Sequence, residues 1–409
     1  MTNRIITKLS LVLLLIGCSS LAAKAQAPTY TIGTVVADGQ LFQPTSVALD
    51  SSGNIYIADA GNNVIRKVDP SGNMTVIAGV PGRSQKYKQW TGPKGPKSPG
   101  ACRSTTGDWC PAAKALFSGP RNIAVDGQGN LYVSDFSASK IRRVDAASSK
   151  VTIYAGGQTG GWSAAQLDNP EGIAFDAQGN LYIADKANNA VRKVAPPAVP
   201  KAKGAITTIA GLGPGSPGCP VDGAAAVASP LKSPEDVAVD GAGNVYIAVT
   251  GCRRIYEIGA DGNVHTVVGS GQRKGGNPAH VPYNGPTSSA LAVNLSIPVG
   301  VKVDAGGNLY ISDAGARVVW RYDAASQTVS AIGGAGPDPS LSPTCSGAQN
   351  SFGDGCAASQ VKLNVPYRVA IDALGDVYVP EHGELEAPAR PFAIRILQPG
   401  APAPPATGQ

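Results

Sequence analysis

Residues 170–193 read PEGIAFDAQGNLYIADKANNAVRK, and the first half of this stretch recurs six times along the chain. Each copy has a proline, five residues, an aspartate, two residues, a glycine, an asparagine or aspartate, one aliphatic residue and a tyrosine. The aspartates are Asp50, Asp126, Asp176, Asp240, Asp304 and Asp372. A repeat of this kind indicates that one structural unit is built six times.

Each unit is predicted to contain four short strands. In the first unit, runs rich in aliphatic and β-branched residues lie at 47–49, 55–58, 64–68 and 74–78. Aspartate, asparagine and glycine separate the runs and favour tight hairpins. The unit is therefore an antiparallel meander. Meanders repeated radially form a β-propeller, in which each blade buries its faces against its two neighbours.

The composition agrees with an all-β fold. Hydrophobic residues make up 43% of the 409 residues and charged residues 15%, so the chain can bury a large core. The 51 glycines and 33 prolines have no Gly-X-Y period, which indicates many turns and excludes collagen. Long amphipathic helical patterns are missing.

The ends of the repeat region predict how the ring closes. The last unit has a third strand at 394–396 and then lacks a fourth, whereas residues 30–37 precede the first unit and match a fourth strand. The N-terminal strand should therefore complete the last of six four-stranded blades, which removes the open sheet edges. The propeller spans residues 30–398, and the Pro- and Ala-rich segment 399–409 is predicted to be a disordered tail.

The units resemble NHL repeats, whose pattern is Pro-x-Gly-Ile-Ala-Val-Asp, then Gly-Asn-x-Tyr-Val-Ala-Asp, then Asn-Asn-x-Ile-Arg-Lys. The copy at 170–193 matches this pattern best, and the resemblance covers residues 30–397. It implies a bacterial, exported propeller, usually of six blades, that serves mostly as an extracytoplasmic or scaffold binding surface. A minority of the family are lyases and lactonases.

The N-terminus has the features of an export signal. Arg4 and Lys8 precede an apolar run at 11–16 that is too short to span a bilayer. Two processing routes stay open: cleavage after Ala25, which gives a signal peptide of residues 1–25, or a lipoprotein signal of residues 1–17 with Cys18 lipidated. Either route places the protein in the periplasm, on the outer membrane or outside the cell, with membrane contact only through the lipid.

The charge of the chain excludes nucleic-acid binding as its main role. The formal net charge is +6, and removing residues 1–25 takes away three of the 34 basic residues and no acidic one. The small excess that remains is far below what phosphate binding requires.

The cysteines predict disulfides. Outside the signal region six remain, and an even number in an exported chain favours disulfide bonds, although their connectivity stays open. Cys102 with Cys110, and Cys345 with Cys356, are close in sequence and are expected to pair locally. Cys219 and Cys252 then pair by elimination, which is feasible because both fall on the loop-bearing face of the propeller.

Residues present in every copy are explained by the blade itself. This applies to the repeat aspartates and tyrosines, and we expect the acidic residue that ends most second strands to cap a loop. The Gly-Asp motifs in the insertions, such as 107–112 and 353–358, should organise the junctions between blades; a cation site is the alternative.

Function is better sought where the blades differ at equivalent positions. The two residues after the repeat proline vary most, and they should ring the channel mouth on the loop-bearing face. Lys302 is a further outlier, because the other five blades have alanine there. The candidate ligand-binding residues are Thr45, Arg121, Asn122, Glu171, Glu235, Asp236, Lys302, Tyr367 and Arg368. Such a ring is expected either to recognise a polar or zwitterionic ligand or to form mutual ion pairs.

Signs of catalysis are weak. His265, His280 and His382 have no zinc-binding spacing, and no nucleophile stands beside a base. We therefore predict a binding or interaction module without catalytic residues or cofactor, whose partner is a protein, a glycan or a small polar ligand. The alternative is a calcium-dependent lactonase- or lyase-like hydrolase. Its metal ligands would come from Glu171, Glu235, Asp236 and Glu381.

Overall fold

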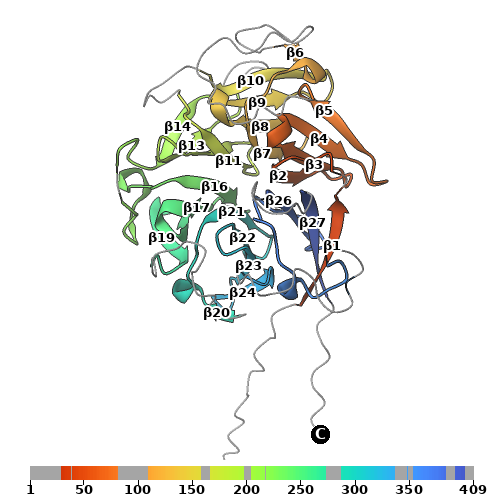
Figure 1. Cartoon of the computed structure of the whole chain (residues 1–409). Coiled ribbons are helices and arrows are strands. Elements are labelled where there is room, and N and C mark those ends of the chain that lie inside the picture. Colours follow the sequence, from red (N-terminus) through yellow and green to blue (C-terminus); the bar gives the residue numbers. More distant parts are fainter. Residues whose placement is uncertain are drawn as a thin grey trace, which may run out of the picture.

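The strands form six separate antiparallel sheets arranged as a ring (Figure 1). The computed structural model describes residues 29–37, 39–81, 109–157, 166–197, 204–216, 218–272, 287–336, 348, 353–383 and 392–400. Each sheet is one blade, so the predicted six-bladed all-β propeller is confirmed. The signal region with Cys18 and residues 401–409 of the predicted tail lie outside the described residues. The predicted boundary at 399 is wrong by one residue, because Pro399 ends the last strand and pairs with Tyr30.

Four strands build each blade, and the blades are numbered 1 to 6 in the order of their repeat prolines. The innermost strands are β2 (Pro44–Leu49), β7 (Pro120–Val125), β11 (Pro170–Phe175), β16 (Pro234–Val239), β21 (Pro298–Val303) and β25 (Ala370–Ile371). The second strands are β3 (Ile55–Asp59), β8 (Leu131–Asp135), β12 (Leu181–Asp185), β17 (Val245–Val249), β22 (Leu309–Asp313) and β26 (Val377–Glu381). The third strands are β4 (Val64–Val68), β9 (Lys140–Val144), β13 (Ala190–Val194), β18 (Arg254–Ile258), β23 (Val318–Asp323) and β27 (Ala393–Pro399). The outermost strands are β5 (Met74–Ala78), β10 (Lys150–Gly156), β14 (Ile206–Ala210), β19 (Asn263–Val268), β24 (Thr328–Gly333) and β1 (Tyr30–Val36).

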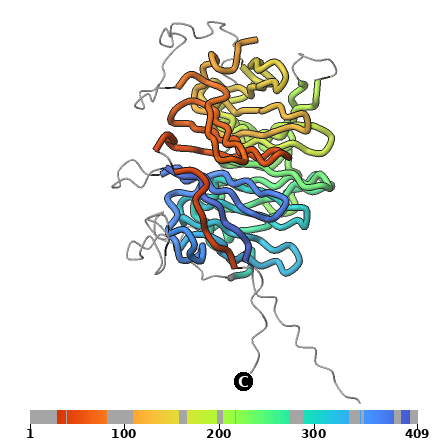
Figure 2. The backbone as a smooth tube through the Cα atoms, turned by 90° about the vertical axis from the view of Figure 1, so that its right-hand side faces the viewer, coloured from red at the N-terminus to blue at the C-terminus, as the bar shows by residue number. Residues whose placement is uncertain are grey.

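Strand β1 closes the ring as predicted. It pairs antiparallel with β27, from Tyr30 opposite Pro399 to Val36 opposite Ile394. Figure 2 shows the first described strand, in red, lying along the last one, in blue. The sixth blade thus contains strands from both ends of the chain.

The repeat aspartate shapes the hairpin between the first and second strands. In blade 1, Oδ1 of Asp50 accepts the backbone N–H groups of Ser52 and Asn54 at 2.9 Å. Its Oδ2 accepts the Asn54 side-chain amide at 2.7 Å and the Tyr56 hydroxyl at 3.0 Å. Each of the other five repeat aspartates accepts the hydroxyl of the tyrosine six residues further along the chain. The repeat aspartates and tyrosines therefore stabilise the hairpin of each blade, which confirms the prediction that they are structural.

The acidic residue at the end of the second strand anchors the chain where it enters the blade. In blade 3, buried Asp185 accepts the Asp168 backbone N–H at 2.7 Å and the Arg192 Nε–H at 2.9 Å. Equivalent acid–arginine pairs are Asp59 with Arg66, Asp135 with Arg142, and Glu381 with Arg395. The loop-capping interpretation is confirmed.

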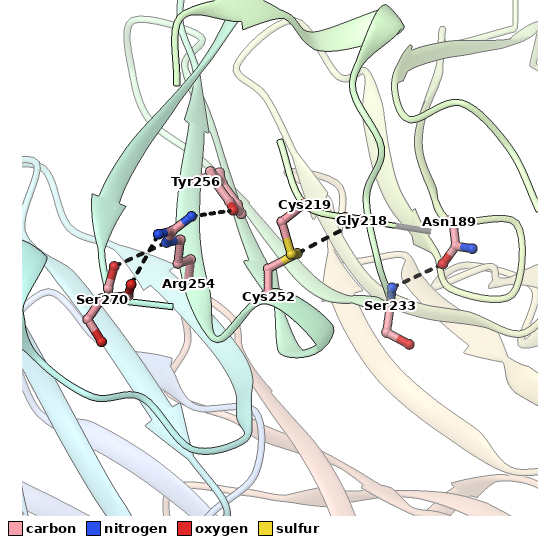
Figure 3. The surroundings of a disulfide bond; sticks show 9 residues. Asn189, Gly218, Cys219, Ser233, Cys252, Arg254, Tyr256 and Ser270 are labelled. Atoms are coloured by element: carbon pink, nitrogen blue, oxygen red, sulfur yellow. Dashed lines mark hydrogen bonds between the residues drawn. A yellow bond between two sulfur atoms is a disulfide. The ribbon is translucent and has the colours of Figure 1, made fainter. Parts of the chain in front are cut away.

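A disulfide takes the place of this acid–arginine anchor in blade 4. Val249 and Tyr256 stand where the other blades have the acid and, in four of them, the arginine. Here Cys219, on the chain entering the blade, is bonded to Cys252, in the turn between the second and third strands (Figure 3). The predicted pair is confirmed. Cys110 and Cys356 are disulfide-bonded as well, and their predicted partners, Cys102 and Cys345, lie outside the described residues.

The junction motifs connect neighbouring blades through added strands and backbone hydrogen bonds. Strands β6 (Cys110–Pro111), β15 (Ala224–Ala225) and β20 (Thr287–Ser289) each add a fifth strand to the outer edge of the blade that follows. The residue after each of these strands, and the equivalent Ala358 before blade 6, accepts at its carbonyl oxygen an N–H from the glycine that follows the outermost strand of the preceding blade. These pairs are Gly79 with Ala112, Gly211 with Ala226, Gly269 with Ala290, and Gly334 with Ala358. The motifs therefore organise the junctions, as expected.

Apolar side chains fill the space between adjacent blades. Trp320 and Ile311 of blade 5, both almost fully buried, share a cluster with Ala248 and Ile255 of blade 4. This packing fixes the inner strands of the blades against one another. Among the described residues, no helix has the length and apolar character needed to cross a membrane.

Candidate functional site

Most of the site is built by the residues that follow the repeat proline, which open the innermost strands of blades 1 to 5 and directly precede that of blade 6. The strand register shifts after the repeat proline in blades 1 to 5, and such irregularities redirect the side chains beside them. The first position after the proline holds Thr45, Arg121, Glu171, Glu235, Val299 and Tyr367. The second position holds Ser46, Asn122, Gly172, Asp236, Gly300 and Arg368.

Arg368 links three blades. Its side chain is fully buried, and its Nη2 donates to Glu171 Oε2 of blade 3 at 2.7 Å and to Glu235 Oε2 of blade 4 at 3.1 Å. The same nitrogen contacts the Glu235 carbonyl oxygen at 3.0 Å. Because Arg368 belongs to blade 6, opposite blade 3 in the ring, this contact crosses the propeller axis (Figure 1).

Lys186 completes the charge cluster. Its Nζ lies 2.6 Å from Glu235 Oε1 and 3.4 Å from Glu171 Oε1, and 31% of its side chain is exposed. Burial and the Glu171 charge raise the pKa of Glu235 above its ordinary value. Burial alone would lower the pKa of Lys186, but the attraction of Glu235 and Glu171 outweighs it, so this pKa is raised. The cluster therefore holds two carboxylates and two cations, and only Lys186 is substantially exposed.

Asp236 lies beside the cluster and packs so closely against Gly172 that no side chain fits at position 172. A Cβ on Gly172 would overlap both the Asp236 carboxyl and its Cα. Asp236 Oδ2 accepts the Val301 backbone N–H at 3.0 Å and lies 3.9 Å from Lys302 Nζ. Burial raises the pKa of Asp236, against the pull of Lys302 and Arg368. Asp236 and Lys302 thus form a second ion pair, between blades 4 and 5.

Aromatic side chains lie on blades 2 and 6, the two neighbours of blade 1 in the ring. The rings of Tyr367 and His382 are stacked, with centroids 5.0 Å apart and planes inclined by 24°. Arg121 lies 4.8 Å from the centroid of Phe136, and Arg368 lies 5.0 Å from that of Tyr367. Arg121, Phe136, Tyr367 and His382 are all partly exposed. Burial and the charge of Arg121 lower the pKa of His382 to about 4, so this imidazole is neutral at pH 7.

Sequence reasoning missed three residues of this site: Phe136, Lys186 and His382. Each directly follows the acidic residue that ends a second strand. The blades differ at this position as strongly as they do after the proline, since the other three have Ala60, Thr250 and Ala314. The comparison of blades that selected Arg121 and Glu171 would have found these residues too.

The predicted site residues separate into three groups. Glu171, Glu235 and Arg368 come together with Lys186, Arg121 and Tyr367 lie with the aromatic rings, and Asp236 pairs with Lys302. Thr45 and Asn122 are fully buried at the start of β2 and β7, and the Thr45 hydroxyl donates to the Pro120 carbonyl oxygen at 3.1 Å.

Glu381 lies apart from the other candidate metal ligands. It accepts the Asn364 backbone N–H at 2.8 Å and lies 3.7 Å from Arg395 in the anchor of blade 6. The described residues contain no group of three or more histidine, cysteine, aspartate or glutamate side chains placed to hold a metal ion. Glu171 and Glu235 do approach each other, but Arg368 and Lys186 lie between their carboxylates. This donor set does not fit a calcium ion as it stands.

Several buried polar atoms around the axis have no hydrogen-bond partner among the described residues. They are Nε and Nη1 of Arg368, Oδ1 of Asp236, the Ser312 hydroxyl and the side-chain amide of Asn122. Leaving such atoms unpaired costs about 1–3 kcal/mol each. The arrangement therefore favours a polar group, from water or from a ligand, among these side chains.

Comparisons with known proteins agree with this architecture. A family model described as NHL repeat matches residues 43–67 and 167–194. No curated protein matches the chain in sequence.

Solved structures share the fold at low sequence identity. A protein of unknown function from Bacteroides thetaiotaomicron has a TM-score of 0.57 and 15% identity, over 91% of this chain and 76% of that one. An auxiliary nutrient binding protein from Bacteroides ovatus has a TM-score of 0.55 and 13% identity, over 91% and 78%. A gluconolactonase from Xanthomonas campestris has a TM-score of 0.51 and 14% identity, over 91% and 90%. At these identities the likeness extends to the fold alone.

Proposed function

Since the chain is a six-bladed β-propeller in which residues 43–67 and 167–194 match the NHL repeat, we propose that it is a binding module that holds a small polar ligand at its channel mouth. The observation that carries the proposal is the cluster of Glu171, Glu235, Lys186 and Arg368. These side chains occupy positions where the six blades otherwise have no common residue, so the repeat architecture does not explain them.

Stability does not explain the cluster either. Desolvation of buried charges offsets most of their mutual attraction, and apolar residues of similar size often stabilise a protein as well or better. Two buried carboxylates beside a fully buried arginine are therefore a costly way to close a channel. The unpaired atoms of Arg368 and Asp236 add to this cost. A site that must recognise polar groups accounts for both features.

We also propose that the protein acts outside the cytoplasm. The basic and apolar pattern of residues 1–17 supports export, and so does the Cys219–Cys252 bond, because disulfides persist in oxidising compartments. The mass of the mature N-terminus would show whether Cys18 is lipidated or the chain is cleaved after Ala25.

A ligand screen with one informative variant tests the proposal. Purified mature protein is screened by thermal shift against a library of small anions, cations, zwitterions and sugars. We expect hits that disappear in Lys186→Met and persist in Lys67→Met, which removes a half-buried lysine from β4, away from the site. Hits that bind both variants equally would place binding elsewhere and refute the channel-mouth site.

Metal content separates this proposal from the calcium-dependent hydrolase. We expect the ligand to bind equally well before and after chelation. One divalent ion per chain that is lost together with ligand binding in Glu235→Gln would overturn the proposal in favour of a metal-dependent lactonase or lyase activity.

A further inference from the structure

The charges that a ligand meets at the channel mouth are positive. The carboxylates of Glu171 and Glu235 are nearly inaccessible, with 1% and 5% of these residues exposed. Lys186 is 31% exposed on its side chain, and Arg121 is partly exposed. The buried acids hold Lys186 in place, while its ammonium group remains reachable. The accessible surface therefore favours an anion, although the cluster as a whole contains both signs.

The uncharged surface of the mouth is aromatic. Phe136, Tyr367 and His382 are partly exposed, and they come from blades 2 and 6, next to Arg121 and Arg368. His382 is neutral at pH 7, so it offers a flat ring without a competing positive charge. Flat rings prefer offset-stacked or edge-to-face contacts with other rings, which stabilise a complex beyond the area that they bury.

The cation and the stacked rings come from opposite blades of the ring. Lys186 belongs to blade 3, which faces blade 6 with its stacked Tyr367 and His382 across the ring. Arg368 connects the two sectors, because it lies over Tyr367 and contacts Glu171, which in turn contacts Lys186. A ligand at the axis therefore meets a cation on one side and an aromatic surface on the other.

We infer that the ligand is an organic anion that carries a flat ring, with its carboxylate or equivalent acid group at Lys186 and its ring against Tyr367 and His382. The inference rests on the proposed function, since it names the ligand class of the same site.

Three probes separate the two parts of the ligand. Phenylacetate carries both ring and carboxylate, acetate lacks the ring, and 2-phenylethylammonium has the ring with the opposite charge. Binding of each to the full mature chain is followed by ligand-observed NMR titration at pH 7. We expect phenylacetate to bind at least about tenfold more tightly than 2-phenylethylammonium, because only the carboxylate accepts a charge-assisted hydrogen bond from Lys186. It should also bind at least about tenfold more tightly than acetate, because acetate has no ring to bury.

Variants at Lys186 and Tyr367 test the carboxylate contact and the ring contact separately. Lys186→Met should weaken phenylacetate binding about tenfold or more, Lys186→Arg should retain most of it, and the control Lys67→Met should leave it unchanged. Tyr367→Leu should weaken binding about two- to tenfold, whereas Tyr367→Phe, which keeps the ring, should not. Far-UV circular dichroism and the melting temperature report whether each variant is folded. If Lys186→Met does not fold, two comparisons still test the inference. They are the affinities of acetate and 2-phenylethylammonium, and the affinities of the Tyr367→Leu and Tyr367→Phe variants for phenylacetate.

The outcomes distinguish this inference from the function on which it rests. Tighter binding of 2-phenylethylammonium, or equal binding of acetate and phenylacetate, overturns the ligand class. If library hits of another class are nevertheless lost in Lys186→Met, the channel mouth remains the binding site. If no compound from the library or the probe set depends on Lys186, both proposals fail.

Discussion

Removal of the Arg368 guanidinium should expose the energetic cost of the charge cluster. Arg368→Met keeps an unbranched apolar side chain but leaves Glu171 and Glu235 buried without their shared arginine. Both carboxylates lie within 3.1 Å of the lost Nη2, and the arginine is fully buried. Breaking a buried ion pair by removing one partner costs about 3–5 kcal/mol. We therefore expect the free energy of unfolding to fall by about that amount at pH 7.5.

The loss should depend on pH in a defined direction. The folded-state pKa of Glu235 is already above its ordinary value because of burial and the Glu171 charge, and Arg368 is one of the groups that hold it down. Without Arg368 this pKa rises further. A carboxyl with a raised folded pKa binds more protons in the folded state, so stability increases as the pH falls through that pKa. The deficit of Arg368→Met should thus be smaller at pH 5 than at pH 7.5, by about 1–3 kcal/mol.

Urea unfolding followed by tryptophan fluorescence at both pH values measures these differences. The matched control is Arg143→Met, because Arg143 pairs with Asp145 at 2.9 Å while both side chains are about a quarter exposed. Exposed pairs contribute about 0–1 kcal/mol, so this variant should change little. A loss below about 1 kcal/mol for Arg368→Met at pH 7.5, or a loss that grows at pH 5, would refute the reasoning.

Three further measurements test the surroundings of the site. Gly172→Ala places a methyl group on the neighbouring buried carboxylate and its Cα, so it should destabilise the protein by about 1–3 kcal/mol or more. The control Gly241→Ala meets no atom within 4 Å and should change stability by less than about 0.5 kcal/mol in the same urea titration; equal effects would contradict the close approach of blades 3 and 4. The double variant Cys219→Ala/Cys252→Ala should lose about 2–4 kcal/mol, and a reductant should lower the melting temperature of the parent more than that of the variant; an identical drop would show that this bond is not the sensitive one. The His382 imidazole should titrate with a midpoint of about 4 in proton NMR, and a midpoint near 6.5 would mean that it is not buried beside cations.

The blade architecture was predictable because its signals are local. Asp50 bonds to residues two, four and six positions further on, so a short pattern encodes the whole hairpin and six copies make it unmistakable. The closing pair β1–β27 was predictable by counting strands. The boundaries were less accurate: the innermost strand of blade 1 starts at Pro44 and not at 47, since the residues around the register shift have no alternating pattern.

The contacts of the site were only partly predictable, because they depend on distances across the ring. The sequence identified Glu171, Glu235 and Arg368 as variable positions. It did not indicate that Arg368 reaches a glutamate 197 residues away, nor that Lys186 lies close to both glutamates. These contacts depend on the arrangement of six blades around one axis. The spacing of residues along the sequence does not reveal which residues that arrangement brings together.

The pairing of β1 with β27 has a consequence for how the ring is made during synthesis. Strand β1 is the first of the described strands to be synthesised, and its partner β27 is the last. Until Ala393–Pro399 has been made, β1 has no inner neighbour, and an unpaired strand edge invites association with other chains. Closing contacts between such distant segments are also slow to form. Shielding of Tyr30–Val36 during this interval is therefore a requirement that this fold places on the cell.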